Sequence, residues 1–243
     1  MTPPGVDLPW LSAEQMAEVD RAMVQDYGIL LPQMMELAGR HLAGLARDRF
    51  LAREHPRQRV VVLAGKGGNG GGALVAARRL SGWGIDASVV LSTDARRLAA
   101  VPRHQLETVR RMGIDVRGTD ALPPEAPALV IDGVIGYGLR GDPRESAAAL
   151  ISWANATTAP ILALDLPSGL DATTGAAGRP TVEATATMTL ALPKQGLRGD
   201  GAERFVGELY LADIGVPRQL YAQPPLGLSA PDVFATSDRV RLR

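Results

Sequence analysis

Six short runs of aliphatic and β-branched residues constrain the fold of this chain more than any other feature. They read "RVVVLA" (59–64), "DASVVLS" (86–92), "ALVIDGV" (128–134), "PILALDL" (160–166), "ATATMTLAL" (184–192) and "GELYLAD" (207–213). The first, third and fourth runs are almost continuously apolar, which is typical of strands covered by helices on both faces. Helical patterns over Ala73–Trp83, His104–Met112 and Glu145–Ala154 separate several of the runs. This order predicts an α/β protein, a Rossmann-like three-layer αβα sandwich around a mostly parallel sheet.

The segments on either side of this alternating core are expected to complete a single domain, residues 1–243. Two helices are predicted within residues 12–51. The first begins at the capping residue Ser12, and the second covers about Pro32 to Leu51. The α/β core is predicted over residues 58–217. Residues 218–243 show no clear period, so we expect an irregular tail that wraps the surface.

Composition excludes several classes of protein. The 26 basic and 26 acidic residues give a formal net charge of zero, which argues against a nucleic-acid partner. Cysteine is absent, so disulfides, a thiol nucleophile and cysteine metal sites are excluded. Neither a basic, apolar leader nor a membrane-length apolar run is present, so we expect a soluble cytoplasmic protein with no membrane partner. The three histidines, His41, His55 and His104, lie away from the strand ends, and we expect no functional role for them.

Four of the predicted strands end in polar, glycine-containing segments. These segments are "GKGGNGGG" (65–72), "GYGLRGDPR" (136–144), "LDLPSGLD" (164–171) and "PKQGLRG" (193–199). Asp132 lies at the end of the third strand, while Asp165, Ser168 and Asp171 lie at the end of the fourth. Each segment alone has a common turn composition. Because ligands of open parallel sheets bind beyond the carboxyl ends of the strands, their convergence predicts a ligand site at that edge.

The glycine run after the first strand leaves more than one interpretation open. Glycines inside regular elements cost stability, so close approach of the backbone to a phosphate-bearing ligand is a reason for them. "GKGGNG" (65–70) matches the dinucleotide pattern G-x-G-x-x-G, with Asp94 as a candidate ribose-binding acid. A dehydrogenase is disfavoured because no hydride-transfer acid, such as Tyr-x-x-x-Lys, is found. A P-loop is excluded because no Gly-Lys-Ser/Thr follows. The two lysines of the chain, Lys66 and Lys194, both lie in such glycine-containing segments.

Six segments in order resemble the NAD(P)H-hydrate epimerase family, the YjeF N-terminal domain, in its stand-alone form. They are "LSAEQMAEVDRAMVQDYGI" with "MMELAGRHLA", "GKGGNGGGALVAARRL", "VIDGVIGYGLRG", "LALDLPSGLDATTG", "TMTLALPKQGL" and "GELYLADIGVP". The resemblance implies a Rossmann-like fold and a homodimer. It also implies a metabolite-repair isomerase that interconverts the R and S hydrates of NADH and NADPH (NADHX and NADPHX), which carry a hydroxyl at C6 of the reduced nicotinamide ring. A separate dehydratase then restores the cofactor.

The resemblance also implies roles for individual residues. A potassium ion would be held by Asn69, Asp132 and Ser168, which offer the oxygen ligands that hard cations prefer. Asp165 would transfer protons at the hydroxyl-bearing carbon. The substrate would contact Gly68, Asn69, Gly70, Gly71, Gly72, Gly136, Tyr137, Gly138, Leu139, Arg140, Gly141, Asp142, Asp165 and Lys194.

The glycine segment departs from the family pattern at three positions. Gly68 stands where the family has a first asparagine, Gly72 where it has an aspartate, and Lys66 where it has a proline. The loss of the aspartate keeps an alternative open, a catalytically silent nucleotide-ligand-binding or scaffold module of the same fold. The retained Asn69 and Asp165, with Asp132 and Ser168, favour the enzyme.

Overall fold

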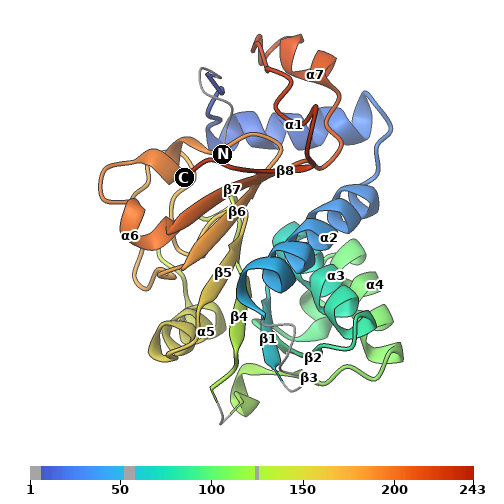
Figure 1. The fold of residues 1–243 in the computed structure, drawn as a ribbon, viewed down its shortest axis with the longest axis vertical. Helices are drawn as coiled ribbons and strands as arrows, with labels where there is room; N and C mark the ends of the chain where they lie inside the picture. The colour runs from blue at the N-terminus through green and yellow to red at the C-terminus, as the bar shows by residue number, and fades with distance from the viewer. Residues whose placement is uncertain (1–6, 52–57, 124–125) are drawn as a thin grey trace.

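The computed structural model describes residues 7–51, 58–123 and 126–243, and its strands form one central sheet (Figure 1). The strands are β1 (Arg59–Ala64), β2 (Asp86–Leu91), β3 (Val116–Arg117), β4 (Leu129–Gly133), β5 (Ile161–Leu164), β6 (Ala186–Leu190), β7 (Glu208–Ala212) and β8 (Arg239–Arg241). The helices are α1 (Ala13–Gln25), α2 (Leu31–Phe50), α3 (Gly68–Gly82), α4 (Ala100–Arg111), α5 (Glu145–Ala156), α6 (Glu203–Val206) and α7 (Arg218–Ala222). Short 3₁₀ turns are η1 (Ala95–Arg97), η2 (Thr119–Ala121) and η3 (Gln195–Arg198).

The sheet is parallel throughout except at one edge. Its order is β3-β2-β1-β4-β5-β6-β7-β8, and the β7–β8 pair is antiparallel. The chain runs from β1 outward to β3, then returns to the other side of β1 with β4. Beyond the carboxyl ends of β1 and β4 this reversal leaves the crevice in which ligands of open α/β sheets bind. The predicted α/β class and mostly parallel sheet are confirmed.

All six predicted runs contain a strand, and two further strands were not predicted. β3 has two residues, and β8 has three residues, in "RVR" of the expected irregular tail. The prediction of an irregular tail over residues 218–243 is therefore wrong in part, because this segment also contains the short helix α7. The register of β8 places Val240 opposite Leu211 of β7. So short a strand depends on its partner strand, and its own residues carry little periodic signal.

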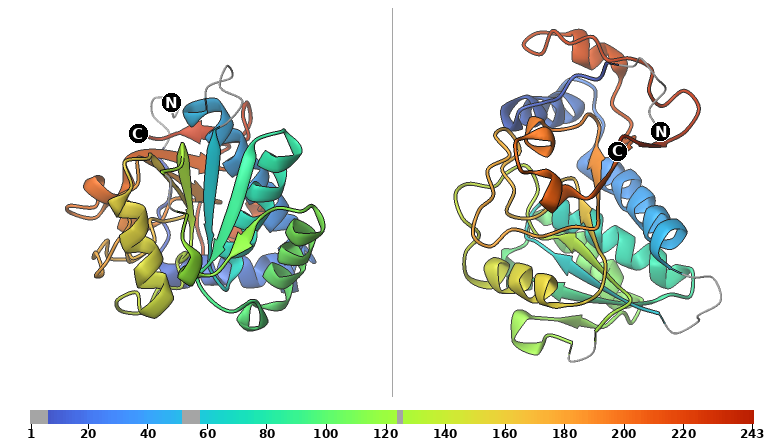
Figure 2. Two further views of the ribbon diagram at one scale, coloured as in Figure 1. Left: turned by 90° about the horizontal axis from the view of Figure 1, so that it is seen from below. Right: turned by 60° about the vertical axis from the view of Figure 1, so that its left-hand side comes forward.

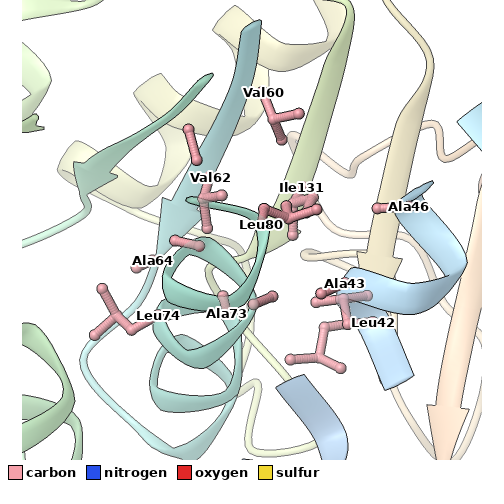
Figure 3. Close-up of a cluster of buried hydrophobic side chains, with 14 of the residues drawn as sticks. Leu42, Ala43, Ala46, Val60, Val62, Ala64, Ala73, Leu74, Leu80 and Ile131 are labelled. Atoms are coloured by element: carbon pink, nitrogen blue, oxygen red, sulfur yellow. The ribbon is translucent and has the colours of Figure 1, made fainter. Parts of the chain in front are cut away.

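The sheet separates two apolar layers because successive side chains of each strand point to opposite faces. Val60 and Val62 of β1 pack with α2 and α3 in one cluster, while Val61 and Leu63 pack with α5 in another. Figure 2 shows α5 on one side of the sheet and α2 to α4 on the other. Figure 3 shows the first cluster, in which small alanines of α2 and α3 approach the leucine and valine side chains. No described helix has the length and hydrophobicity needed to cross a bilayer.

The glycine run is helical from Gly68 onward, so the prediction that α3 begins at Ala73 is wrong. Gly67 is the N-cap residue, and the expected substrate loop forms the first turn of the helix. A Cβ on Gly70 would lie 1.9 Å from the carbonyl oxygen of Gly65. On the facing helix, a Cβ on Gly39 would lie 2.4 Å from the Cβ of Val75. These glycines are therefore required by close contact between the helix, the strand end and α2.

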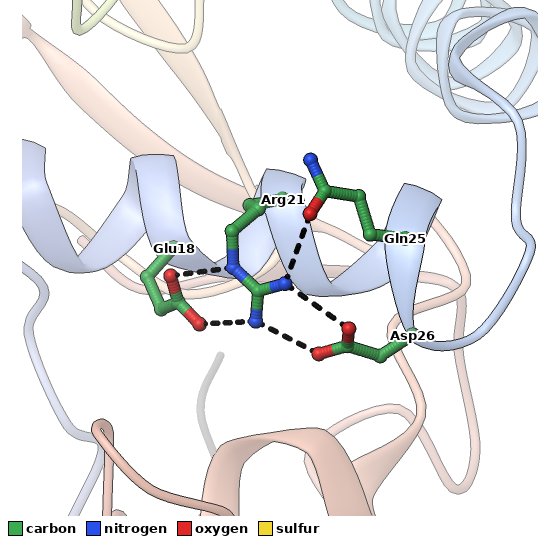
Figure 4. A network of polar contacts seen from close by, with 4 residues as sticks. All are labelled: Glu18, Arg21, Gln25 and Asp26. Carbon is green, nitrogen blue, oxygen red and sulfur yellow. Dashed lines mark hydrogen bonds and ion pairs between the residues drawn. The ribbon is translucent and has the colours of Figure 1, made fainter.

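Helix α1 is held at both its start and its outer face. Ser12 and Gln15 form a reciprocal capping box, in which each side chain accepts a hydrogen bond from the other's backbone N–H. On the outer face, Arg21 donates to Glu18, Gln25 and Asp26 (Figure 4). Just before the helix, Leu11 pairs with the backbone around Lys194 as an isolated parallel bridge. The Leu11 bridge ties the start of α1 to the segment after β6, and the helix lies across the top of β6 and β7 (Figure 1).

Replacement of Gly39 by alanine is expected to lower the free energy of unfolding by about 1–3 kcal/mol, since the added methyl group overlaps Val75 and the backbone of Gly72. The matched control is Gly82→Ala at the end of α3, where nothing lies within 4 Å of the added Cβ. That control should be stabilised by about 0.5–1 kcal/mol. Urea unfolding of both variants measures the difference. Equal stability of the two variants would show that α2 and α3 are not in close contact at Gly39.

Candidate active site

A cavity of about 470 Å³ opens at the carboxyl edge of the sheet, where β1, β4 and β5 end. Its size is within the usual range for small-molecule sites. Helices α1 and α2 and the first turn of α3 complete its wall. The polar side chains that line it are Asp20, Lys66, Asn69, Tyr137, Asp165 and Lys194. The larger apolar side chains that line it are Met16, Leu31, Met34, Met35, Val134, Ile135, Leu164, Leu190 and Ile214.

Asp165 and Lys194 form a buried ion pair in this cavity. The ammonium group of Lys194 donates to Oδ1 of Asp165 and, at 2.8 Å, to the carbonyl oxygen of Leu190. The Lys194 side chain is fully buried and Asp165 is nearly so. Thr189 donates to the same Asp165 oxygen at 3.3 Å. A buried charge is tolerated only when it is paired and hydrogen-bonded, and both conditions are met here.

The backbone conformation at Asp165 and the backbone bonds on either side of Lys194 fix the positions of both partners of this ion pair. Asp165 follows β5 with φ of 67°, in the left-handed region that few residues other than glycine and asparagine or aspartate adopt. Its N–H donates to the carbonyl oxygen of Met188 on the neighbouring strand at 2.8 Å. Strained residues of this kind cluster at functional sites. Leu11 holds the other partner, because its N–H and carbonyl bond to Pro193 and Gln195 on either side of Lys194.

Behind the cavity, Asp132 and Ser168 form a second buried polar pair. The Asp132 carboxylate accepts hydrogen bonds from Ser168 N at 2.8 Å, Ser168 Oγ at 2.6 Å and Val134 N at 3.1 Å. Ser168 Oγ in turn accepts from the N–H of Ile135 at 2.8 Å. Burial raises the pKa of Asp132, and the three hydrogen bonds oppose that rise. The carboxylate is thus surrounded by neutral donors and would be stabilised by a cation.

Asn69 lies in the first turn of α3 and turns its amide toward the β4–α5 loop. A Cβ on Gly136 would lie 3.3 Å from Cγ of Asn69, so the glycine admits the amide. The Nδ2 atom of Asn69 is buried, and no described group accepts a hydrogen bond from it. Gly67 offers no side-chain cap, so the first N–H groups of α3 also face the cavity end without a side-chain partner. Lys66 is exposed at the rim. This corner is suited to an anionic or oxygen-rich ligand.

Asp20 of α1 is a site residue that the sequence analysis missed. It lines the cavity and accepts a hydrogen bond from the hydroxyl of Tyr137 at 2.5 Å. Burial raises the pKa of Asp20, while the Tyr137 hydrogen bond and the charge of Lys194 lower it. Burial, followed by the charge of Asp20, raises the pKa of Tyr137. The available signal was the position of Asp20 between Met16 and Met23, which puts a carboxylate on the apolar stripe of the helix.

The structure brings part of the predicted substrate set together. The predicted residues that line the cavity are Gly68, Asn69, Gly72, Gly136, Tyr137, Gly138, Asp165 and Lys194. Gly70 and Gly71 are instead buried in the packing of α3 against Gly65 and Met35.

Other predicted residues lie outside the cavity lining. In the loop after Gly138 they are Leu139, Arg140, Gly141 and Asp142. Asp142 accepts a hydrogen bond from the N–H of Arg179 at 2.9 Å. Asp94, the alternative ribose-binding acid, caps η1 and pairs with Arg96. His41 and His104 lie in α2 and α4 away from the lining, and His55 is outside the described residues.

Comparison with protein families gives a match over residues 31–196 to the model described as "YjeF-related protein N-terminus". An NAD(P)H-hydrate epimerase from Dehalogenimonas lykanthroporepellens is 42% identical over 87% of this chain and 84% of its own length. One from Rhodopirellula baltica is 33% identical over 92% of this chain and 91% of its own.

Longer relatives and a solved structure extend this picture. A bifunctional NAD(P)H-hydrate repair enzyme from Salinibacter ruber is 38% identical over 86% of this chain, but the match spans only 41% of that enzyme. The crystal structure of the yeast protein ynu0 superposes with a TM-score of 0.83, covering 97% of this chain and 100% of the yeast chain at 23% sequence identity. At that identity the yeast structure supports the fold alone.

Replacement of Lys194 by methionine is expected to lower the free energy of unfolding by about 3–5 kcal/mol at pH 8, because Asp165 is left buried without its partner. A buried carboxylate without a partner is costly only while it carries its charge. The deficit should therefore shrink as the pH falls toward 5.

The control for this variant is Arg204→Met, which removes a pair with Glu183 whose side chains are 67% and 54% exposed. It should change stability by less than about 0.5 kcal/mol at either pH. Chemical unfolding at both pH values is the measurement. A Lys194→Met deficit that does not depend on pH would contradict the assignment of the ion pair.

Proposed function

The chain belongs to the family of YjeF-related N-terminal domains, and from that membership we propose that it is an NAD(P)H-hydrate epimerase, an isomerase of nicotinamide cofactor repair. The observation that carries the proposal is the similarity to stand-alone epimerases over most of both chains, at 42% identity for the Dehalogenimonas enzyme. The site supports it, because Asp165, Asn69 and Lys194 meet in one cavity of ligand size.

The shape and polarity of the cavity suit a dinucleotide hydrate. Its apolar side, formed by methionines of α1 and α2 and by Leu164, fits a nicotinamide ring. The first turn of α3, with Lys66 at the rim and the free Nδ2 of Asn69, offers donors to phosphate oxygens. Leu164 packs closely against Gly72 on this apolar side, since an added Cβ would lie 3.0 Å from its Cδ2.

The reaction needs a proton to be moved at one oxygen. The hydrate has a hydroxyl on C6 next to the ring nitrogen, and this hemiaminal carbon inverts through loss and return of water or through ring opening. Both routes need a group that gives and accepts a proton at that oxygen. We propose Asp165 for this role, and the proposal is supported by its position in the cavity lining and by its ion pair with Lys194.

We propose that the product passes to a dehydratase. Related bifunctional repair enzymes are longer proteins, of which this chain spans about two fifths. Their name, bifunctional NAD(P)H-hydrate repair enzyme, describes two activities in one chain, and this chain matches only one part of it. We also propose the homodimer that the resemblance implies and the cytoplasmic location that the sequence analysis led us to expect.

We propose a potassium ion next to this cavity, held by Asn69, Asp132 and Ser168. The donor set fits a hard monovalent cation, since it combines amide, carboxylate and hydroxyl oxygens. The fit also rests on Asp132, a fully buried carboxylate whose recorded donors are all neutral. When bound, the ion would supply positive charge near the phosphate-binding turn of α3. It would also order Asn69, whose buried Nδ2 has no hydrogen-bond partner among the described residues.

The proposed activity predicts that the purified protein accelerates inversion of R-NADHX to S-NADHX above the spontaneous rate. An S-specific dehydratase with ATP or ADP, in the presence of potassium, reports the S form as it appears. Asp165→Asn should lower kcat by about 10²–10⁴, because the proton-transferring group is lost. It should also lower the free energy of unfolding, because Lys194 is left buried without its charged partner, so kcat is compared for the folded fraction. Asp94→Asn is the control and should retain kcat within about threefold, since Asp94 lies outside the cavity.

The same assay tests the rival function. A wild-type protein that binds the hydrate but does not accelerate its inversion would be a catalytically silent module, and the epimerase proposal would be rejected. Activity in the wild type would show in turn that glycine at position 72 is tolerated.

Potassium binding is expected to raise the thermal midpoint of the protein in KCl relative to LiCl at equal ionic strength. Each kcal/mol of binding free energy raises the midpoint by about 2–4 °C in a protein of this size. Asn69→Ala should abolish the difference between the salts. Glu14→Gln, which alters an exposed carboxylate of α1, should leave it unchanged. Equal midpoints of the wild type in both salts would reject the proposed site.

A further inference from the structure

The proposed reaction has so far used one carboxyl group, yet the cavity is lined by two. Asp165 stands at the end of β5, on the sheet side of the cavity. Asp20 comes from α1, the helix that crosses the strand ends above β6 and β7 (Figure 1). The two carboxyl groups therefore enter the same cavity from different elements.

Asp20 is held in place at one of its two oxygens. Its Oδ2 accepts the hydrogen bond from Tyr137, and within the described residues no hydrogen bond to its Oδ1 is recorded. The second oxygen is thus available to a ligand in the cavity. The neighbouring Arg21 pairs with Glu18 and Asp26 instead of Asp20 (Figure 4).

The groups around Asp20 favour a carboxyl group that can both give and accept a proton. The titratable groups that act on it are Tyr137, Lys194 and Asp165, and Tyr221 is close enough to feel its charge. Lys194 is already paired with Asp165, so one ammonium serves two carboxylates. Burial raises the pKa of Asp20, and the Tyr137 hydrogen bond opposes that rise. A proton on Asp20 would leave this region of the cavity with no net charge, as a low-dielectric site prefers.

Inversion at C6 by loss and return of water has a geometric requirement that one carboxyl group does not meet. The hydroxyl leaves from one face of the ring, and water must add to the other face. A proton has to be delivered on the first face and accepted on the second. Because the reaction is reversible, each group must be able to do both.

We propose that Asp20 is a second catalytic residue of the epimerase, transferring the proton on one face of the nicotinamide ring while Asp165 transfers it on the other. This inference rests on the proposed function. In one direction Asp20 gives its proton to the C6 oxygen, the C6–O bond breaks with its electron pair on oxygen, and the N1 lone pair forms C6=N1. Water then adds to the opposite face, the C6=N1 π pair returns to N1, and Asp165 accepts the proton. The reverse reaction exchanges the two roles, and solvent re-equilibrates the carboxyl groups between turnovers.

Tyr137 is a positioning residue in this scheme. Its hydroxyl orients Asp20 and stabilises the carboxylate form, so its removal should raise the pKa of Asp20. This shift distinguishes a positioning role from a packing role, because loss of a residue that only packs would not move the Asp20 limb of the pH profile.

The test measures kcat, KM and the pH profile of R-to-S inversion for Asp20→Asn, Asp20→Glu, Tyr137→Phe and the wild type. Asp20→Asn should lower kcat by about 10²–10⁴, change KM by less than about threefold, and remove one limb of the pH profile. Asp20→Glu should restore part of the lost rate. Tyr137→Phe should keep both limbs and move the Asp20 limb to higher pH.

The control is Asp26→Asn, which alters the carboxylate at the end of the same helix that pairs with Arg21 on the outer face. It should retain kcat within about threefold. Retention of kcat in folded Asp20→Asn, or a Tyr137→Phe profile that matches the wild type, would overturn the role of Asp20. If the wild type and Asp26→Asn are both inactive, the proposed function itself has failed. Should Asp20→Asn not fold, the limb shift in Tyr137→Phe decides the question.

Discussion

The buried ion pair between Lys194 and Asp165 is the interaction on which the site depends. Two charges removed from water are stable only when each satisfies the other, so the ends of β5 and β6 must meet with little freedom. The left-handed backbone at Asp165 and the bridge from Leu11 to Lys194 both help to bring the two charged groups together. The ion pair in the cavity is therefore part of the buried packing of the domain, as the aliphatic layers are.

The glycine-rich first turn of α3 joins packing and binding in the same residues. Gly70 lets the helix start directly against the end of β1, and Gly39 lets α2 lie against α3. The turn can then direct Asn69 and its own N–H groups toward the cavity. Glycine replaces the aspartate that the family places at position 72, so the cavity loses a charge there, and Leu164 packs where a side chain would begin.

Much of this arrangement could be predicted from local pattern. The apolar runs identify six strands because both of their faces are buried, and the polar segments after them point to the edge where Asn69, Asp165 and Lys194 line one cavity. Asp20 was missed because a single carboxylate on an amphipathic helix usually faces solvent, and only the packing of α1 shows otherwise. The start of α3 was misplaced because glycine disfavours helices, whereas tight contacts with Gly65 and α2 override that preference. The strand β8 depends on β7, which no local pattern of the tail reveals.

The bridge between Leu11 and Lys194 has a consequence for how the protein is made. Leu11 lies near the N-terminus, whereas Lys194 lies in the last quarter of the chain and lines the cavity. Contacts between residues so distant in sequence form slowly, because a long loop must close before they are gained. During synthesis the ribosome would release β1 and α3 well before Lys194, so the early half of the domain waits with an open, apolar edge. The segment ahead of α1 leaves the ribosome first, yet it can make its bridge only after Lys194 has been synthesised.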